Sequence, residues 1–294
     1  MKFNLKCILE LLRVKQWVKN TFIFFPLLFA GQFFQQELLI NTLITFFGFC
    51  LASSGLYILN DYLDREQDRF HPRKAQRPLA QGNFNPIVIK SLITIFILLG
   101  LLTCLLVGQR VFIAVLIYIA LHLLYNTIMR KVVLLDVIFI AFGFLIRIGA
   151  GSLAANVSPS VWLLMCVFLL ALFLGFTKRR YEISSLGEKA SQHRSVLAHY
   201  NIYLLDQIII ICSTLAIVFY GLYTISEDIF RRLGSYHLAY SLVFVIYGIF
   251  RYLYLIHMHK KGDDPGEILA TDSPLLINVL LWILFVSYIL YTKL

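Results

Sequence analysis

Nine apolar stretches of about 16–22 residues recur along this 294-residue chain, and they constrain its fold more than any other feature. A helix needs about 20 apolar residues to cross the hydrocarbon core of a bilayer, so each stretch is a candidate transmembrane helix. Soluble domains are about 25% charged. Here only 14% of the residues are charged and 60% are hydrophobic, which excludes a water-soluble globule and a disordered chain. We expect an all-α, polytopic membrane protein with spans near residues 20–35, 39–59, 87–108, 111–129, 134–155, 161–177, 204–225, 238–257 and 274–292.

The positions of lysine and arginine test this count of spans. With the N-terminus inside the cell, 21 of the 26 basic residues fall in inside segments, four fall outside, and Arg147 falls within a span. An excess of basic residues on the cytoplasmic side is typical of membrane proteins. We therefore predict a cytoplasmic N-terminus and an outside C-terminus in the cell (inner) membrane. The net charge of +10 then reflects topology rather than nucleic-acid binding.

No linker marks a second domain, so we expect residues 1–294 to form a single transmembrane domain. The two longest inside loops, about 60–86 and 178–203, carry clusters of acidic and basic residues. Loops that only join helices need neither this length nor this charge, so we expect the active site on the cytoplasmic face. A short interfacial helix is predicted within residues 1–19, because one helical face collects Leu5, Ile8, Leu9 and Leu12.

Three aspartates follow the second predicted span, in the string Asn60-Asp61-Tyr62-Leu63-Asp64-Arg65-Glu66-Gln67-Asp68. On a helix, Asp61, Asp64 and Asp68 share one face, where like charges repel each other unless a cation lies between them. Carboxylate oxygens suit Mg²⁺, which commonly bridges to substrate phosphates. A single aspartate here would favour a solvated helix end, but three at this spacing favour a Mg²⁺ site.

Basic residues follow the aspartates directly, in His71-Pro72-Arg73-Lys74-Ala75-Gln76-Arg77-Pro78-Leu79-Ala80-Gln81-Gly82. The two prolines stiffen the segment that presents these bases. Acids for a metal beside bases for phosphate oxygens are the combination that a Mg²⁺–diphosphate substrate requires. Ordinary positive-inside charge accounts for any one of the bases, but it does not account for their alternation with acids.

This pattern resembles the UbiA superfamily of intramembrane prenyltransferases, which are nine-helix proteins with a Mg²⁺–diphosphate site. The strings NDYLDREQDRFHPRKAQRPLAQG and RVKQWVKN are similar, more specifically, to its decaprenyl-phosphate phosphoribosyltransferase branch, although Val14 replaces that branch's usual proline. The resemblance covers essentially the whole chain. It implies a UbiA-like bundle in which the metal ligands are Asp61, Asp64 and Asp68.

The segment after the sixth span separates two substrate classes. Aromatic prenyltransferases of the superfamily carry a second aspartate-rich motif there, roughly DxxxD. Here the chain reads Thr177-Lys178-Arg179-Arg180-Tyr181-Glu182, with one acid. A Lys-Arg-Arg cluster adds the capacity to bind further phosphate groups, and 5-phosphoribosyl diphosphate carries a 5-phosphate beside its diphosphate. The alternative is that these residues only stop the span through ordinary positive-inside charge. The KRRxE string is also what the phosphoribosyltransferase branch shows.

We therefore expect an enzyme, a phosphoribosyltransferase that moves 5-phosphoribose from 5-phosphoribosyl diphosphate to a polyprenyl phosphate and releases diphosphate, with Mg²⁺ as cofactor. The resemblance also implies a product for cell-wall precursor biosynthesis.

An arginine within a span, such as Arg147, is energetically costly and is a functional candidate for that reason. The alternative is that Arg147 has a structural role and pairs with helix carbonyls or Asp136. The expected catalytic residues are Asp61, Asp64, Asp68 and Lys178, and the expected substrate-binding residues are Asn60, Lys74, Arg77, Arg179, Glu182, Lys15, Gln16, Lys19, Asn20, Lys131 and Arg147.

Two other functions stay open at this point. A prenyltransferase that acts on an aromatic or quinone-precursor acceptor would call for the second DxxxD motif that the chain lacks. A transporter or lipid-binding protein would need no Mg²⁺ and often shows inverted repeats. The expected partners are the bilayer, the polyprenyl phosphate and 5-phosphoribosyl diphosphate, without nucleic acid, and a homo-oligomer is left open.

Overall fold

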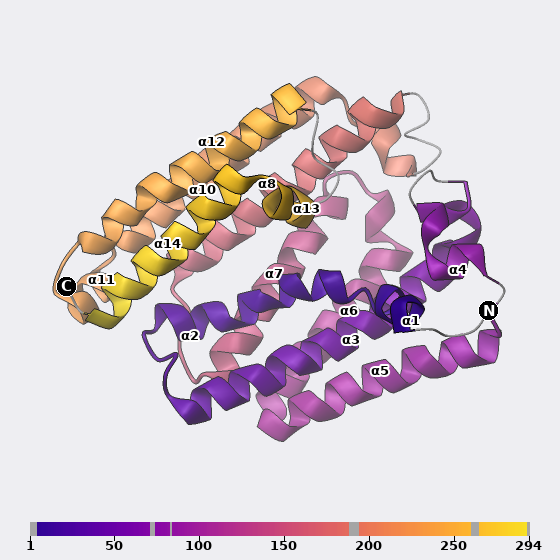
Figure 1. The fold of residues 1–294 in the computed structure, drawn as a ribbon, viewed down its shortest axis with the longest axis horizontal. Helices are drawn as coiled ribbons and strands as arrows, with labels where there is room; N and C mark the ends of the chain where they lie inside the picture. Colours follow the sequence, from indigo (N-terminus) through magenta and orange to yellow (C-terminus); the bar gives the residue numbers. More distant parts are fainter. Residues whose placement is uncertain (1–4, 71–73, 83, 188–193, 260–264, 293–294) are drawn as a thin grey trace. The chain divides into compact units, whose positions relative to one another are not determined.

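The computed structural model describes residues 5–70, 74–82, 84–187, 194–259 and 265–292, which are mostly helical and contain no strand. Within these residues, eight helices are long and apolar enough to cross a membrane, so the all-α, polytopic fold class is confirmed. They are α3 (Gln36–Asp68), α5 (Pro86–Val107), α6 (Gln109–Thr127), α7 (Leu135–Ala154), α8 (Val161–Leu186), α10 (Ile202–Thr224), α12 (Leu242–His259) and α14 (Ser273–Thr292) (Figure 1).

The first predicted span, residues 20–35, is not an α-helical span in the described structure. The chain forms a 3₁₀-helix, η1 (Val14–Phe24), followed by the short helix α2 (Phe25–Phe29). Pro26 has no N–H, so a continuous α-helix would lack its bond to the Phe22 carbonyl. Because a 3₁₀-helix rises about 2.0 Å per residue, the part of η1 and α2 that lies within the predicted span, residues 20–29, extends about 18 Å, which is less than the thickness of the hydrocarbon core.

The chain divides into two compact units. Unit 1 comprises Met1–Leu27, Phe33–Met129 and Ile146–Ser158, and unit 2 comprises Leu28–Gln32, Arg130–Leu145 and Pro159–Leu294. Each unit combines segments that are far apart in the sequence, and α7 contributes its first part to unit 2 and its last part to unit 1. The single domain predicted for residues 1–294 stays a prediction.

Unit 1 is built around α3, which runs alongside α5 (Figure 1). Small residues permit this close approach. A Cβ atom on Gly100 of α5 would lie 2.7 Å from both the carbonyl oxygen of Gly48 and the backbone nitrogen of Ala52 on α3. Such small-residue contacts between helices are typical of membrane proteins, where van der Waals packing replaces the hydrophobic effect. The core of the unit continues through Phe49 of α3 and Tyr118 of α6, both fully buried.

The predicted N-terminal helix forms as α1 (Leu5–Leu11), but it turns a different face toward the protein. Cys7 and Leu11 are buried, whereas Ile8 and Leu9 of the predicted apolar face are exposed. Leu11 packs in one cluster with Leu79 of the short helix α4 (Pro78–Gln81). The helix is thus held to the protein by its Leu11 side, while Ile8 and Leu9 stay exposed.

Unit 2 has its core along α8 and α10, which pack against each other. Phe173 and Phe176 of α8 are buried with Leu205 of α10 and Tyr252 of α12. Helices α10, α12 and α14 run alongside one another (Figure 1). The connections contain η5 (Ser195–His199), α11 (Glu227–Leu233), η6 (His237–Ser241) and α13 (Pro265–Thr271).

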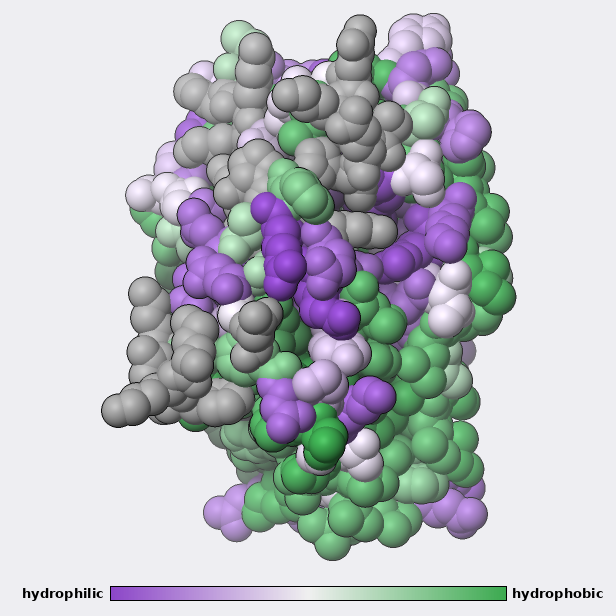
Figure 2. Space-filling model, turned by 90° about the vertical axis from the view of Figure 1, so that its right-hand side faces the viewer, coloured by the Kyte–Doolittle hydropathy of each residue, from purple (hydrophilic) through white to green (hydrophobic). Residues whose placement is uncertain are grey.

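The outer surfaces of the spans are apolar. On α5 the exposed side chains include Leu98, Leu102, Leu105 and Leu106. A continuous apolar surface of this kind is unfavourable in water and suits the hydrocarbon of a bilayer. Figure 2 shows a face on which hydrophilic residues gather near the centre and hydrophobic residues cover much of the lower part. The chain is therefore a multi-pass membrane protein.

Candidate functional site

The three aspartates of the first motif lie on the last turns of α3. The helix continues to Asp68, so these residues belong to the helix rather than to the predicted loop 60–86. Asp61 and Asp68 are buried, with 3% and 4% of their surface exposed, and Asp64 is half-buried between them along the chain. Buried carboxylates require charged or hydrogen-bonding partners, and those partners come from outside the helix.

Arg77 is one of these partners. It precedes Pro78 and therefore takes an extended backbone conformation, with φ −65° and ψ 141°, at the start of α4. The buried Leu79 anchors α4, which fixes the direction from which Arg77 approaches. Its Nη1 donates to Asp61 Oδ1 at 3.0 Å and to Asp68 Oδ2 at 2.6 Å. The two carboxylates thus converge on one cationic nitrogen atom.

Arg13 is the second partner, and the sequence interpretation gave it no role in the site. Its Nε donates to Asp61 Oδ2 at 3.1 Å, its Nη2 donates to the other oxygen of that carboxylate, and the guanidinium carbon lies 5.1 Å from the centroid of the Tyr57 ring. Arg13 joins α1 to η1 in the left-handed conformation, with φ 50° and ψ 47°. We call Arg13, Asp61, Asp68 and Arg77 the Asp61 cluster.

Arg147 lies in a second polar group of unit 1. Its Nε donates to Asn20 Oδ1 and its Nη2 donates to the Tyr118 hydroxyl, both at 2.7 Å, and all three residues are buried. Asn20 in turn donates to Ser53 Oγ of α3 at 3.3 Å. The alternative that Arg147 pairs with Asp136 is wrong, because the two residues are 11 positions apart on α7, about 16 Å along a helix axis.

The remaining predicted residues of unit 1 are more exposed. Lys15 on η1 is exposed, Gln16 and Lys19 on η1 are half-buried, and so is Asn60 on α3. The backbone of Lys74 belongs to η2 (Lys74–Gln76), but its side chain lies outside the described residues, as do residues 71–73. Their predicted roles in substrate binding stay predictions.

The second motif lies on α8 in unit 2. Because α8 continues to Leu186, Lys178 and Glu182 are on a helix rather than in the predicted loop 178–203. Arg179 is buried, and its Nε donates to Asp136 Oδ2 at 2.7 Å while its Nη1 donates to Glu182 Oε2 at 2.8 Å. Arg179 therefore joins the acid of the KRRxE string to a buried carboxylate of α7.

Two further residues complete this group, and sequence reasoning missed both. The Tyr200 hydroxyl donates to Asp136 Oδ1 at 2.8 Å and accepts from the Leu134 N–H at 2.7 Å. Burial and the neighbouring Asp136 carboxylate raise the pKa of Tyr200, so its hydroxyl stays protonated as a donor. An Nη1 of Arg194 lies 3.7 Å from Asp136 Oδ2. The Asp136 cluster comprises Asp136, Arg179, Glu182, Arg194 and Tyr200.

Two predicted lysines of unit 2 differ in their surroundings. Lys178 is half-buried and lies one helical turn before Glu182, beside the Asp136 cluster. Lys131 is exposed at the end of η3 (Met129–Lys131). The structure thus associates Lys178, but not Lys131, with the buried charges of this unit.

Each cluster pairs two acids with two arginines, but the charged residue beside each cluster differs. At the end of α3, Asp61 and Asp68 are opposed by the guanidinium groups of Arg13 and Arg77, and Asp64 adds a third carboxylate on the same helix. In the second cluster, Asp136 and Glu182 are opposed by Arg179, Arg194 and the neighbouring Lys178. An excess of carboxylate favours a cation, and an excess of basic groups favours phosphate.

The Asp61 cluster has ligands of the type that Mg²⁺ prefers. Within the described part of the chain, no three His, Cys, Asp or Glu side chains are assembled as a ligand set. Oxygens of Asp61 and Asp68 nevertheless both reach the positively charged Nη1 of Arg77. Mg²⁺ is usually held by one or two carboxylates together with waters and substrate phosphates, so this pair fits a divalent cation.

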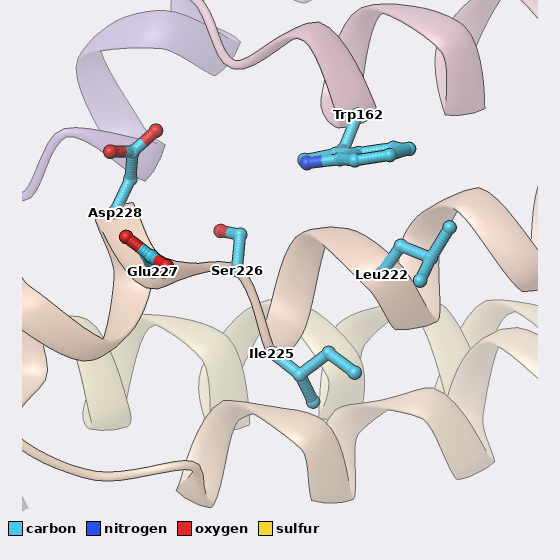
Figure 3. A pocket seen from close by; sticks show the side chains of 6 residues that line it. All are labelled: Trp162, Leu222, Ile225, Ser226, Glu227 and Asp228. Atoms are coloured by element: carbon cyan, nitrogen blue, oxygen red, sulfur yellow. The ribbon is translucent and has the colours of Figure 1, made fainter.

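Two cavities lie away from these contacts. One of about 290 Å³ in unit 1 adjoins the neighbouring face of α3, where its lining includes Arg65, Glu66 and Leu79. Another of about 490 Å³ in unit 2 lies where α8 begins and α10 ends (Figure 3). The residues that line it are Trp162, Leu222, Ile225, Ser226, Glu227 and Asp228. Because this lining has two carboxylates and no basic side chain, the cavity is unsuited to phosphate.

The buried position of the Asp136 cluster leads to a stability prediction. Asp136→Asn removes a fully buried charge that holds Arg179, and breaking one side of a buried ion pair typically costs about 3 kcal/mol or more. We expect thermal unfolding in detergent to show this loss. Asp206→Asn is the matched control, because Asp206 pairs with Arg180 but is 29% exposed and should cost less than about 1 kcal/mol. Equal losses in the two variants would contradict the prediction.

Comparison with known proteins identifies the family of the chain. The UbiA prenyltransferase family matches residues 21–265. The chain is 30% identical to the decaprenyl-phosphate phosphoribosyltransferase of Mycolicibacterium smegmatis, over 94% of this chain and 90% of that protein. It is 29% identical to the Corynebacterium glutamicum protein of the same name, over 96% of this chain and 86% of that one. A UbiA homolog from Archaeoglobus fulgidus, solved bound to GPP and Mg²⁺, shares the fold with a TM-score of 0.70 and 17% identity, over 97% of this chain and 99% of that one. The chain therefore belongs to the UbiA prenyltransferase family and is a transferase of the membrane.

Proposed function

We propose that this protein transfers 5-phosphoribose from 5-phosphoribosyl diphosphate to a polyprenyl phosphate, with Mg²⁺ as the cofactor. The observation that carries the proposal is the convergence of Asp61 and Asp68 on one cationic atom, with Arg13 beside them. Relatives that span nearly the whole chain are named decaprenyl-phosphate phosphoribosyltransferase, which supports the same substrate class.

The Asp61 cluster binds the diphosphate end of the donor in this proposal. Asp61, Asp64 and Asp68 hold the metal, which when bound neutralises charge that develops on the departing diphosphate. Arg13 and Arg77 donate hydrogen bonds to diphosphate oxygens and orient the donor, as guanidinium groups do at phosphate sites. The bond from ribose C1 to the diphosphate oxygen breaks, and a bond from C1 to an oxygen of the lipid phosphate forms. Attack from the opposite face inverts C1.

The second motif favours this donor over a prenyl diphosphate. In the family's aromatic prenyltransferases, a second aspartate motif at this place serves a further metal. Here Glu182 is engaged by Arg179, and the two arginines of the Asp136 cluster balance its two acids. The neighbouring Lys178 therefore adds one basic side chain in excess. Lys178 is the residue that we assign to a substrate phosphate, while Arg179 positions Glu182 through the contact that they share. In 5-phosphoribosyl diphosphate, the 5-phosphate is the group that this positive charge binds.

The acceptor needs little activation. A lipid phosphate is ionised at neutral pH, so no general base is required to make it a nucleophile. Its head group binds where η1 presents Lys15, Gln16 and Lys19, on the cytoplasmic side of the inner membrane, and its prenyl tail lies against apolar helices. The N-terminus is cytoplasmic and the C-terminus lies outside in this orientation.

Transfer of label tests the proposal. Purified protein in nanodiscs is supplied with Mg²⁺, labelled 5-phosphoribosyl diphosphate and a polyprenyl phosphate, and the lipid fraction is then extracted. We expect label in the lipid, dependent on Mg²⁺ and lost in Asp64→Ala. A second arm supplies a prenyl diphosphate and an aromatic acceptor. Prenylation in that arm, without label in the lipid of the first, would replace the proposed activity with prenyl transfer.

A further inference from the structure

The Asp61 cluster is close to electrically balanced without a metal. Asp61 accepts from both Arg13 and Arg77, and Asp68 accepts from Arg77. The carboxylates are almost fully buried, while the two arginine side chains keep 20% and 26% of their surface exposed. The two carboxylates therefore stay in place, whereas the partly exposed side chains of Arg13 and Arg77 have room to move to other positions.

Arg77 and a shared metal ion exclude each other sterically. Its Nη1 lies 3.0 Å from Asp61 Oδ1 and 2.6 Å from Asp68 Oδ2, between the two oxygens that converge. Oxygen ligands approach Mg²⁺ to about 2.0–2.1 Å, which is closer than any contact with a guanidinium nitrogen. A cation held by both oxygens must take the place of this nitrogen.

Arg13 contacts Asp61 while its own backbone is in an unfavourable conformation. A non-glycine residue in the left-handed region is disfavoured by about 1–2 kcal/mol, and Arg13 has φ 50° and ψ 47°. Such strain persists where surrounding contacts compensate for it, and it often marks a functional position. Here the compensating contacts are the paired hydrogen bonds to the Asp61 carboxylate.

We infer that Arg13 and Arg77 are exchange partners: they neutralise Asp61 and Asp68 in the metal-free protein and move to the diphosphate oxygens when metal and diphosphate bind together. This inference rests on the proposed function, since it takes a metal–diphosphate pair as the ligand. It adds coupled binding of metal and diphosphate to that function, because neither half of the ligand binds well alone.

Charge explains the coupling. A divalent cation that enters alone meets two guanidinium groups within a few ångströms and removes their carboxylate partners, which is unfavourable at short range. Diphosphate brings several negative charges and gives each guanidinium a new charge-assisted partner that can accept two hydrogen bonds. The pair of ligands therefore restores the balance that the metal alone disturbs.

Binding of Mn²⁺, used in place of Mg²⁺, tests this exchange without any turnover. Equilibrium dialysis of the full-length protein in detergent gives the Mn²⁺ affinity with and without inorganic diphosphate, and electron paramagnetic resonance reports the bound ion. We expect the wild-type protein to bind Mn²⁺ at least tenfold more tightly with diphosphate. Arg13→Gln removes one competing cation and should tighten Mn²⁺ binding about tenfold without diphosphate, while the enhancement by diphosphate falls.

Two variants control for folding and for general charge. Arg13→Lys keeps the charge and should bind Mn²⁺ alone as weakly as the wild-type protein, within about threefold. Arg65→Gln removes the same charge from α3, where Arg65 pairs with Glu66 at the surface, and should leave both affinities unchanged. If the wild-type protein binds Mn²⁺ with diphosphate but Arg13→Gln binds Mn²⁺ alone no more tightly than the wild type, the exchange is wrong and the proposed function still stands. A wild-type protein that binds no Mn²⁺ even with diphosphate overturns the proposed function as well.

Discussion

Replacing Asp61 by asparagine is expected to lower kcat for phosphoribosyl transfer by about 10³-fold, the scale seen when one preorganised electrostatic group is removed from an active site. Asp61 is the acid that contacts both Arg13 and Arg77, and it shares the Nη1 of Arg77 with Asp68. Asparagine keeps the shape but not the charge. The variant therefore loses a metal ligand and leaves two guanidinium groups without the carboxylate that orients them.

The transfer of labelled phosphoribose to lipid, measured at several Mg²⁺ concentrations, checks this expectation. Excess Mg²⁺ should restore little activity, because the missing charge also holds the arginines. Glu66→Gln is the matched control, since Glu66 lies on the same helix but is exposed and pairs only at the surface with Arg65 and Arg69 in the described contacts. Its activity should stay within about twofold of wild type. A comparable loss in both variants would show that charge on α3, rather than the Asp61 cluster, sets the rate.

Hydropathy predicts the membrane helices well because the signal is local. Each of the eight spans in the described residues coincides with an apolar stretch that the bilayer requires. The helix ends are less predictable. Helices α3 and α8 continue through charged turns to Asp68 and Leu186, since helical hydrogen bonding does not end where the hydrocarbon ends. Pro26 lies in the first turn of α2, where its missing N–H accounts for the break between η1 and α2 but not for the 3₁₀ form of η1.

The site was predictable where it depends on periodicity along one helix. Asp61 and Asp68 share a face because they are seven residues apart, and the structure joins them through Arg77. Their partners from elsewhere in the chain were not predictable. Arg13 is 48 positions from Asp61, and Tyr200 is 64 positions from Asp136. A buried acid requires a partner, but only the tertiary fold determines which residue supplies it.

The close approach of η1 to α7 in unit 1 depends on a single glycine, and Gly151→Ala is expected to destabilise the protein by about 3 kcal/mol, at the upper end of overpacking effects. A Cβ atom at this position would lie 1.9 Å from the carbonyl oxygen of Ile23 and 2.8 Å from its carbonyl carbon. Both are backbone atoms, so no side-chain rotation relieves the clash. Ile23 is also three residues from Asn20, whose contact with Arg147 holds the same segment.

Gly149→Ala is the matched control, because in the described part of the chain no atom beyond its own helix backbone lies within 4 Å of the added Cβ. Both glycines are on α7, and alanine is favoured over glycine in a helix by about 1 kcal/mol. The two variants should therefore differ in sign, with Tm in detergent lowered by roughly 5–10 °C for Gly151→Ala and unchanged or raised for Gly149→Ala. A shift of η1 away from α7 also displaces the chain that presents Lys19 and Arg13, so the Gly151 variant should lose transfer activity at temperatures where it is still folded. Similar Tm values for the two variants would mean that η1 is not packed against α7 through Ile23.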